Sequence, residues 1–345
     1  MKKLMSCFIC VIVLISLIIP LGIVSAAEQT NSISSTSKLY DNIELPKISK
    51  NQVDKIKEKI KENNLKPVKQ FTDEEKNNIK KIQDPYTSVS SQGVISTSKN
   101  SNPKKPNIAN QNLAVTSSMT STSETDNREL VYDTGVDPYN SVVQIDFYDQ
   151  VTGDGYSCSG TYINSTTVLT ASHCVYDAYN HRYYSGWVVY PGESGTYFPY
   201  YSYASTNAYV TSGWMNTAPP SEGSIYYNDV PYDFAVIKVN SGHPYSKKVS
   251  SDSTVGHLMT SIGYPGDHSY YSNGYYYYYM YKTIGYITGV NSNVMTHSAY
   301  VTSGMSGGPI MNTSNSVVSV NSTHSWAAIF DTYHLNVINN WALSN

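Results

Sequence analysis

The order of hydrophobic and polar positions divides the chain into three parts. The first part, residues 1–27, has Lys2 and Lys3, then an apolar run from Leu4 to Ile19, and then small residues at Val24–Ala27. This order is typical of a cleavable secretory signal. A membrane anchor is the alternative, but the apolar run is shorter than the about 20 residues that span a bilayer. We therefore expect a secreted, extracellular protein that keeps no membrane segment after cleavage.

The second part, residues 28–126, is rich in Ser, Thr, Asn and Lys and poor in aromatic residues, so it buries little apolar surface by itself. Residues 51–82 differ, because apolar side chains recur there on a Lys/Glu background. These side chains are Val53, Ile56, Ile60, Leu65, Ile79 and Ile82. Their spacing predicts one or two short amphipathic helices, with a solvated helical face as the alternative. We interpret residues 28–126 as a pro-region.

The third part, residues 127–345, has short strand-like runs between clusters of Gly, Pro, Asn and Ser. The clearest runs are 141–147, 187–190, 234–239 and 317–320. Only the tail looks helical, because Leu335, Ile338 and Trp341 are spaced as on one helix face. The sequence thus predicts one all-β domain over 127–345 with a C-terminal helix, a length that all-β barrels often reach.

Charge separates the same parts. Residues 1–125 carry 17 basic and 11 acidic side chains, a net charge of +6, whereas residues 126–345 carry 6 and 15, a net charge of −9. Either the pro-region is attracted to the domain or the two surfaces are solvated independently. A domain this acidic does not favour nucleic acid as a partner.

Tyrosine is heavily used, with 33 residues against six Phe, and residues 275–279 are all Tyr. The simplest interpretation is a surface strand or loop, because aromatic residues favour strands. Binding of glycans or peptides by the Tyr rings is the second interpretation.

Three motifs carry the candidate chemistry. They are Thr170–Cys174 (TASHC), Asp233–Val239 (DFAVIKV) and Gly304–Pro309 (GMSGGP). A serine hydroxyl becomes a good nucleophile when an imidazole takes its proton and a buried carboxylate orients that imidazole. His173, Asp233 and Ser306 are our candidates for base, orienting acid and nucleophile. Each motif alone is a weak signal, and their joint occurrence in this order is much stronger.

The glycines around Ser306 indicate a tight turn. Such a turn aims the backbone N–H groups of Gly304 and Ser306 at the oxygen that becomes negative in a tetrahedral intermediate. We expect these two groups to form the oxyanion hole.

With these motifs, and with segments such as Ser157–Gly160, Ser212–Trp214 and Ile262–Asp267, residues 130–343 resemble chymotrypsin-like serine peptidases of the bacterial glutamyl endopeptidase branch. The resemblance implies two six-stranded antiparallel β-barrels with the active site between them, His173 and Asp233 coming from the first and Ser306 from the second. It also implies protein or peptide substrates, a precursor whose pro-region contacts the domain, and no cofactor.

Two positions depart from the family pattern. Where glutamyl-specific relatives have a His that binds the substrate carboxylate, this chain has Asn321, which we expect with Thr302 and Ser303 to bind the substrate. A shift of one to three residues would bring His324 there instead, but a surface-loop position for His324 is the simpler interpretation. Met305 replaces the Asp that pairs with the new N-terminus in trypsin-like relatives, so that ion pair cannot form.

Two cysteines, Cys7 and Cys10, fall in the signal segment, which leaves Cys158 and Cys174 for the mature protein. A secreted protein sees an oxidising environment, and the family has an equivalent bridge beside its catalytic His, so we expect a disulfide rather than a metal site. No calcium-loop pattern occurs in the sequence.

A secreted binding protein that keeps the fold but not the chemistry is the alternative function. The presence of all three candidate residues argues against it. An esterase could use the same three groups, but the family-like framework favours peptide bonds.

Overall fold

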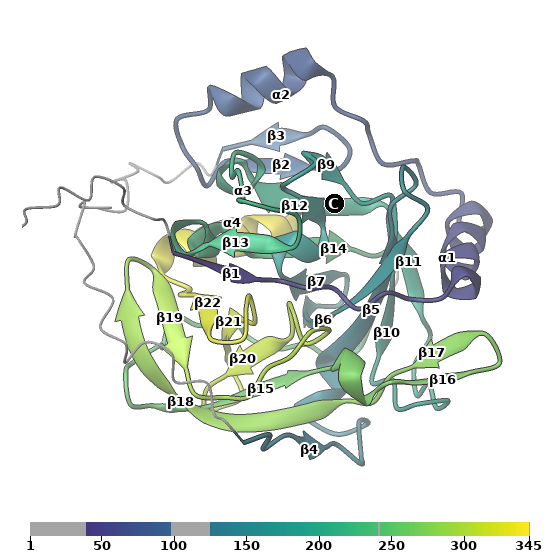
Figure 1. Ribbon diagram of the computed structural model, residues 1–345, viewed down its shortest axis with the longest axis vertical. Coiled ribbons are helices and arrows are strands. Elements are labelled where there is room, and N and C mark those ends of the chain that lie inside the picture. The colour runs from purple at the N-terminus through teal and green to yellow at the C-terminus, as the bar shows by residue number, and fades with distance from the viewer. Residues whose placement is uncertain (1–38, 98–124, 241, 345) are drawn as a thin grey trace, which may run out of the picture. The chain divides into compact units, whose positions relative to one another are not determined.

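We analysed a computed structural model of the chain, which describes residues 39–97, 125–240 and 242–344 (Figure 1). The expected signal peptide, with Cys7 and Cys10, lies outside the described residues. Within these ranges, no helix is both long enough and apolar enough to cross a membrane.

Nine antiparallel strands form the first sheet, in the order β11-β10-β5-β6-β7-β14-β12-β2-β3. Alternating apolar side chains from its central strands, such as Val143, Ile145 and Phe147, build the first core. The strands are β2 (Ser88–Ser90), β3 (Ile95–Ser96), β5 (Val142–Tyr148), β6 (Gly155–Asn164), β7 (Thr167–Thr170), β10 (Gly186–Pro191), β11 (Tyr203–Ser205), β12 (Asn207–Thr211) and β14 (Ala235–Lys238).

The second sheet has seven strands, in the order β21-β20-β15-β18-β19-β22, with β4 paired to β18. Its smaller core contains Met259, Met295 and Ile310. The strands are β4 (Glu129–Leu130), β15 (Leu258–Gly263), β18 (Tyr281–Asn291), β19 (Val294–His297), β20 (Pro309–Met311), β21 (Val317–Val320) and β22 (Trp326–Ala328). Three two-stranded pairs complete the strands: β1 (Tyr40–Asn42) with β13 (Ser224–Tyr226), β8 (Tyr176–Asp177) with β9 (Arg182–Tyr183), and β16 (Tyr270–Ser272) with β17 (Tyr275–Tyr277).

These elements confirm the predicted all-β fold. The four predicted runs correspond to β5, β10, β14 and β21, and the predicted C-terminal helix is α4 (Thr332–Leu343). Asp331 caps α4 by accepting hydrogen bonds from the backbone N–H groups of Tyr333 and His334. Tyr275–Tyr277 of the tyrosine run form β17 and are half-buried beside β16, which agrees with the simpler of the two interpretations. Tyr278 departs from it, because its side chain is fully buried.

The predicted helices in residues 51–82 are present as α1 (Lys50–Glu62) and α2 (Asp73–Lys80). A short helix, α3 (Ser212–Met215), follows β12. Ser49 and Thr72 begin the two longer helices with capping boxes, which satisfy backbone N–H groups that lack a partner inside the helix.

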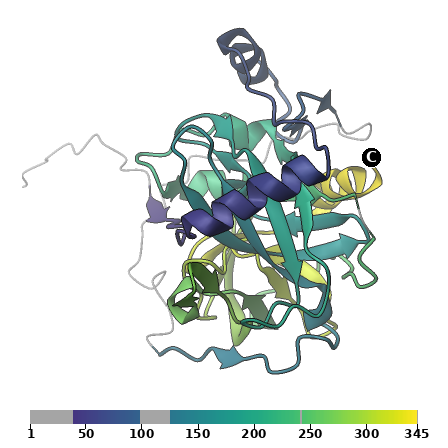
Figure 2. The same cartoon turned by 90° about the vertical axis from the view of Figure 1, so that its right-hand side faces the viewer.

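Helix α1 lies across the first sheet, over β5 and β10 (Figure 2). Its face toward the sheet buries Val53 and Ile56, and Ile48 just before it is also buried. Gly186 on β10 allows the close approach, because a Cβ there would come within 2.2 Å of the Ile60 side chain. Residues 39–97 therefore share a hydrophobic core with the domain instead of forming a core of their own. The strands β2 and β3 extend the first sheet from seven strands to nine, where the sequence predicts a six-stranded barrel.

Two buried carboxyl groups lie beneath α1. Asp146 on β5 accepts hydrogen bonds from the side-chain amides of Gln144 (2.6 Å) and Gln52 (3.0 Å). Burial raises the pKa of Asp146 to about 6, although both amides and the charge of Lys55 act to lower it. Burial, and then the charge of Asp146, also raise the pKa of Glu193 well above its usual value.

We predict that this burial makes the protein less stable as the pH rises through the acid range. In that range the folded state holds a proton on Asp146 that the unfolded state has released, because the pKa moves from 3.8 unfolded to about 6 folded. The stabilisation is therefore complete below pH 3.8 and is lost by about pH 6. In Asp146→Asn, the free energy of unfolding should fall less between pH 4 and pH 8 than in the parent protein, by up to about 3 kcal/mol. Chemical denaturation at several pH values measures the difference.

The denaturation is best measured in a Ser306→Ala background, so that self-digestion cannot interfere. Asp54→Asn, which changes an exposed acid on helix α1 above Asp146, is the matched control. An unchanged pH slope in Asp146→Asn would contradict the prediction.

Candidate active site

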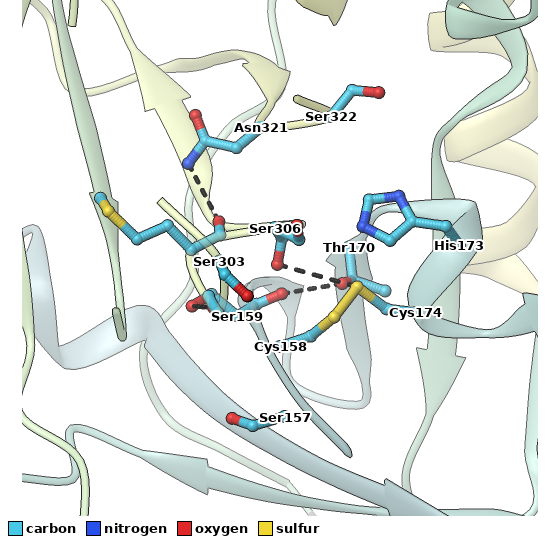
Figure 3. Close-up of a disulfide and its surroundings, with 12 residues drawn as sticks. Ser157, Cys158, Ser159, Thr170, His173, Cys174, Ser303, Ser306, Asn321 and Ser322 are labelled. Atoms are coloured by element: carbon cyan, nitrogen blue, oxygen red, sulfur yellow. Dashed lines mark hydrogen bonds between the residues drawn. A yellow bond between two sulfur atoms is a disulfide. The ribbon is translucent and has the colours of Figure 1, made fainter. Parts of the chain in front are cut away.

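The three candidate residues lie at the ends of strands or in loops between them. His173 lies in a 3₁₀ turn, η2 (Ser172–Cys174), directly after β7, and Asp233 lies between a second 3₁₀ turn, η3 (Tyr227–Tyr232), and β14. Ser306 lies in the loop that joins β19 to β20. Figure 3 shows the imidazole of His173 next to Ser306, so the fold brings the predicted residues of the two sheets together.

Asp233 is fully buried and accepts three hydrogen bonds. One carboxylate oxygen accepts from the backbone N–H of His173 (3.0 Å), and the other lies 2.8 Å from Nδ1 of the same residue. Ser322, which follows β21, donates its hydroxyl to that second oxygen at 2.5 Å. Sequence reasoning missed Ser322, because a serine after a strand carries no signal of its own.

The carboxylate fixes the tautomer of His173. Because an ionised carboxylate only accepts hydrogen bonds, Nδ1 carries the proton and Nε2 is left as a free acceptor. Nε2 is buried and has no hydrogen-bond partner among the described residues. It is therefore available as a general base on the side of the ring that faces Ser306.

The loop around Ser306 is held against the first sheet. Ser159 on β6 donates its backbone N–H to the carbonyl of Ser306 and its hydroxyl to the carbonyl of Gly304, both at 2.8 Å. A Cβ on Gly307 would lie 2.0 Å from the Thr170 hydroxyl, and both Gly304 (φ +95°) and Gly307 (φ +77°) have backbone conformations that favour glycine.

The backbone N–H groups of Gly304 and Ser306 make no hydrogen bond to another described residue. Such donors at the nucleophile can stabilise an oxyanion, and loss of one typically slows a reaction by about 10²- to 10³-fold. The oxyanion role of these two groups therefore stays a prediction.

The predicted disulfide is present. Cys158 on β6 and Cys174 in η2 are bonded across a sequence separation of 16 residues. In the chain-entropy model a bridge over about 15 residues stabilises a protein by about 3 kcal/mol. Because Cys174 is the next residue after His173, the bridge also fixes the turn that carries the imidazole.

A cavity of about 250 Å³ lies beside Ser306. Its lining includes Thr302, Ser303, Ser322 and His324, so two of the three predicted substrate-binding residues border it.

Asn321 does not line this cavity. Its side chain is completely buried behind the Ser306 loop, where its amide donates to the carbonyl of Met305 (3.1 Å) and accepts from the Ser261 hydroxyl (2.9 Å). The buried position excludes direct contact with a ligand in the cavity, and this corrects the expectation for Asn321. His324, the second possibility from the sequence, is the residue that the cavity reaches.

Arg128 supports the same cavity from behind. Its guanidinium donates to the Thr302 hydroxyl at 2.6 Å and to both carboxylate oxygens of Asp267 at 2.8 and 2.7 Å. Burial acts to lower the pKa of Arg128, but its hydrogen bonds to Asp126 and Asp267 outweigh burial and raise it. The sequence offered no motif for this residue, because Asp267 and Thr302, which link it to the cavity, are more than 130 positions away.

Met305 is fully buried in the core of the second sheet. An apolar side chain thus occupies the position before the nucleophile, and it contributes packing there, since a thioether cannot form an ion pair.

The comparisons agree with this geometry. Residues 158–320 match the family model of the trypsin-like peptidase domain. A solved structure of a Glu endopeptidase superposes with a TM-score of 0.55 at 27% identity, covering 64% of this chain and 99% of that one. Residues 158–320 thus match a trypsin-like peptidase domain, and the fold around them is that of the solved Glu endopeptidase.

Two curated proteins are also similar to this domain. The glutamyl endopeptidase of Bacillus licheniformis is 31% identical over 147 residues, which cover 41% of this chain and 41% of that protein. The protein named extracellular metalloprotease of Bacillus subtilis is 31% identical over 153 residues, covering 42% of this chain and 45% of that protein. The chain thus spans less than half of the length of each curated relative.

The name of the Bacillus subtilis relative raises the question of a metal. Within the described residues, the one group of three potential ligands that lie close together is Cys158, His173 and Cys174. Both cysteines are bonded to each other, and a metal binds the free thiolate. The donor set at this peptidase site therefore does not fit a metal ion.

We predict that Ser322→Ala destabilises the fold by about 1.5–3 kcal/mol, because the buried carboxylate of Asp233 loses one of its hydrogen-bond donors. Chemical denaturation at pH 7 of the Ser306→Ala protein with and without the change measures this loss. Ser314→Ala, at an exposed loop position, is the matched control and should change the free energy of unfolding by less than about 0.5 kcal/mol. Equal stability of the two variants would show that the Ser322 hydroxyl does not support Asp233.

Proposed function

We propose that this protein is a secreted serine endopeptidase, made as a precursor, that hydrolyses peptide bonds through an acyl-enzyme intermediate. The observation that carries the proposal is the orientation of His173, whose Nδ1 contacts a buried carboxylate while Nε2 stays free beside Ser306. This is the arrangement that activates a serine for acyl transfer.

In the first half of the reaction, Nε2 of His173 takes the Ser306 proton while Oγ attacks the carbonyl carbon of the substrate. The N–H groups of Gly304 and Ser306 stabilise the negative oxygen of the tetrahedral intermediate. The imidazolium, stabilised by Asp233, gives its proton to the leaving amine, and the C–N bond breaks. A water molecule then repeats the sequence on the ester, releases the acid and restores Ser306.

For the precursor, we propose that residues 1–27 are a signal peptide, 28–126 a pro-region and 127–345 the mature enzyme. Support comes from the Lys-flanked apolar run at the start of the sequence and from the way residues 39–97 pack on the domain, with α1 buried on the first sheet and β2 paired to β12. The similarity to a secreted type of bacterial peptidase agrees with export from the cell.

For specificity, we propose a preference for acidic side chains at the residue before the cut. His324 in the cavity beside Ser306 offers a group that can carry a positive charge, and Arg128 orients the Thr302 hydroxyl in the cavity wall. Two similar proteins carry glutamyl or Glu endopeptidase in their names. A charge-assisted hydrogen bond is about twice as strong as a neutral one.

We predict that Ser306→Ala abolishes hydrolysis, lowering kcat by about 10⁴-fold or more, because the nucleophile is removed. The processed protein and its variant should be given a mixed peptide library, with the cut sites identified by mass spectrometry. The Ser314→Ala protein, prepared and assayed in the same way, controls for activity lost during preparation. Cutting that needs Ser306 and resists a chelator supports the proposal. Cutting that a chelator stops contradicts it, and an absence of cutting favours a binding protein.

We also predict that His324→Gln raises KM for peptides with Glu before the cut by about tenfold, while KM for uncharged residues there changes little. The reason is that Gln keeps a hydrogen-bond donor but cannot carry charge. Steady-state kinetics with matched Glu and Gln peptides measure the difference. Equal losses for both peptides would remove His324 from the specificity site.

A further inference from the structure

Residues 40–48 lie across the mouth of the catalytic cleft. At one end β1 pairs with β13, and the backbone N–H of Ile43 donates to the carbonyl of Gly223 at 2.9 Å. At the other end the N–H of Ser157 donates to the carbonyl of Pro46 at 2.9 Å, and the N–H of Ile48 donates to Gly155 at 3.0 Å. Figure 1 shows β1 beside β13, with the chain continuing past the first sheet into α1. Both ends are thus fixed by backbone hydrogen bonds, as an extended peptide in a binding groove would be.

The middle of this segment is at the nucleophile. The carbonyl oxygen of Glu44 accepts a hydrogen bond from the Ser303 hydroxyl at 2.6 Å, and Ser303 directly precedes the oxyanion-hole residue Gly304. Glu44 also lines the cavity that contains Ser306 and His324.

The same residue borders the side of the cleft that contains the base. A second cavity, of about 460 Å³, is lined by Glu44, Leu45 and His173. Ile43 and Glu44 line both cavities, whereas Leu45 lines only the one that contains His173, so Glu44 is the last residue of the segment that borders the Ser306 cavity. A bond that is to be cut must lie between the attacking oxygen and the group that protonates its nitrogen. The bond after Glu44 joins a residue that borders the Ser306 cavity to one that borders only the His173 cavity.

Pro46 holds the Glu44–Leu45 bond at this place along the cleft. The ring of Pro46 lies against the Ser306 loop, where a Cβ on Gly304 or Gly266 would come within 3.1 or 2.6 Å of Cγ of the ring. Its carbonyl points to Ser157 instead of the nucleophile. The Glu44 carbonyl is thus the one that a hydrogen bond directs to the residues before Ser306.

We infer that the Glu44–Leu45 peptide bond is a processing site, cut by Ser306 of the same molecule. This inference rests on the proposed peptidase function and adds the first substrate of the enzyme, which is its own chain. The uncut segment excludes other peptides from the cleft, and its cleavage opens the site.

The step is an ordinary acyl transfer followed by hydrolysis. Ser306 Oγ forms a bond to the Glu44 carbonyl carbon, its proton passes to His173, and the Glu44–Leu45 C–N bond breaks as His173 protonates the Leu45 nitrogen. Water then cleaves the ester, leaving a carboxylate on Glu44 and a free amine on Leu45. After the cut, the part that ends at Glu44 keeps the three-residue pairing of β1 with β13 and a few hydrogen bonds of Leu39, Ile43 and Glu44. The part that begins at Leu45 remains bound through α1 and β2.

The experiment uses the full precursor without its signal peptide, followed over time by intact mass and by sequencing of new N-termini. We expect the first new N-terminus to be Leu45-Pro46-Lys47, formed with a rate constant that does not change over about a hundredfold range of protein concentration. Hydrolysis of an external reporter peptide should rise in parallel with the cut. Ser306→Ala should stay uncut for as long as the parent is followed.

Glu44→Lys should slow the cut at least tenfold, because it places a cation in the cavity lined by His324. Glu58→Lys makes the same charge change on the exposed face of α1 and should leave the rate unchanged. A first cut elsewhere, a rate that rises with concentration, or equal rates for the two variants would overturn the inference. If Ser306-dependent hydrolysis of external peptides is nevertheless seen, the proposed function survives, and if no substrate is cut the proposed function fails as well.

Discussion

The buried carboxylate of Asp233 is the constraint on which the rest of the site depends. A fully buried charge is costly unless hydrogen-bond donors replace the water that it has lost. Here the donors come from both halves of the domain: His173 supplies two from the first sheet, and Ser322 supplies one from the end of β21 in the second. Satisfying one buried charge therefore joins the two sheets and orients the imidazole.

The need for close contact between the two sheets also explains the glycines of the Ser306 loop. The loop has to reach from the second sheet to within hydrogen-bond distance of Ser159 on β6, and at Gly307 the approach leaves no space for a Cβ beside Thr170. The loop motif thus serves contact between the sheets as well as chemistry. Its small residues bring the nucleophile close to an imidazole held by the other sheet.

The sequence was sufficient for features that depend on local pattern or on a strong motif. Strand runs, the capped helices, the C-terminal helix and the Cys158–Cys174 pair follow from period, spacing and family resemblance, and the structure has all of them. Features set by contacts between distant residues were not predictable. Ser322, Arg128 and the burial of Asn321 depend on which side of a loop each residue occupies after the sheets have packed. A shift of three residues along one loop, from Asn321 to His324, moves a side chain from behind the nucleophile into the cavity.

The opposite net charges of the two parts suggested that electrostatic attraction holds the N-terminal part on the domain. The contacts show instead that burial of apolar side chains contributes most of the binding free energy. The Lys47–Asp154 ion pair between the two parts is exposed, with 67% and 43% of the side chains accessible, and such pairs contribute about 0–1 kcal/mol. Burying Ile48, Val53 and Ile56 contributes about 1.5–3 kcal/mol for each side chain. Charge of opposite sign acts over longer distances and favours encounter, whereas the apolar face of α1 determines where the segment binds. Because α1 directly follows residues 40–48, its position on the first sheet also determines which residues of this segment border the Ser306 cavity.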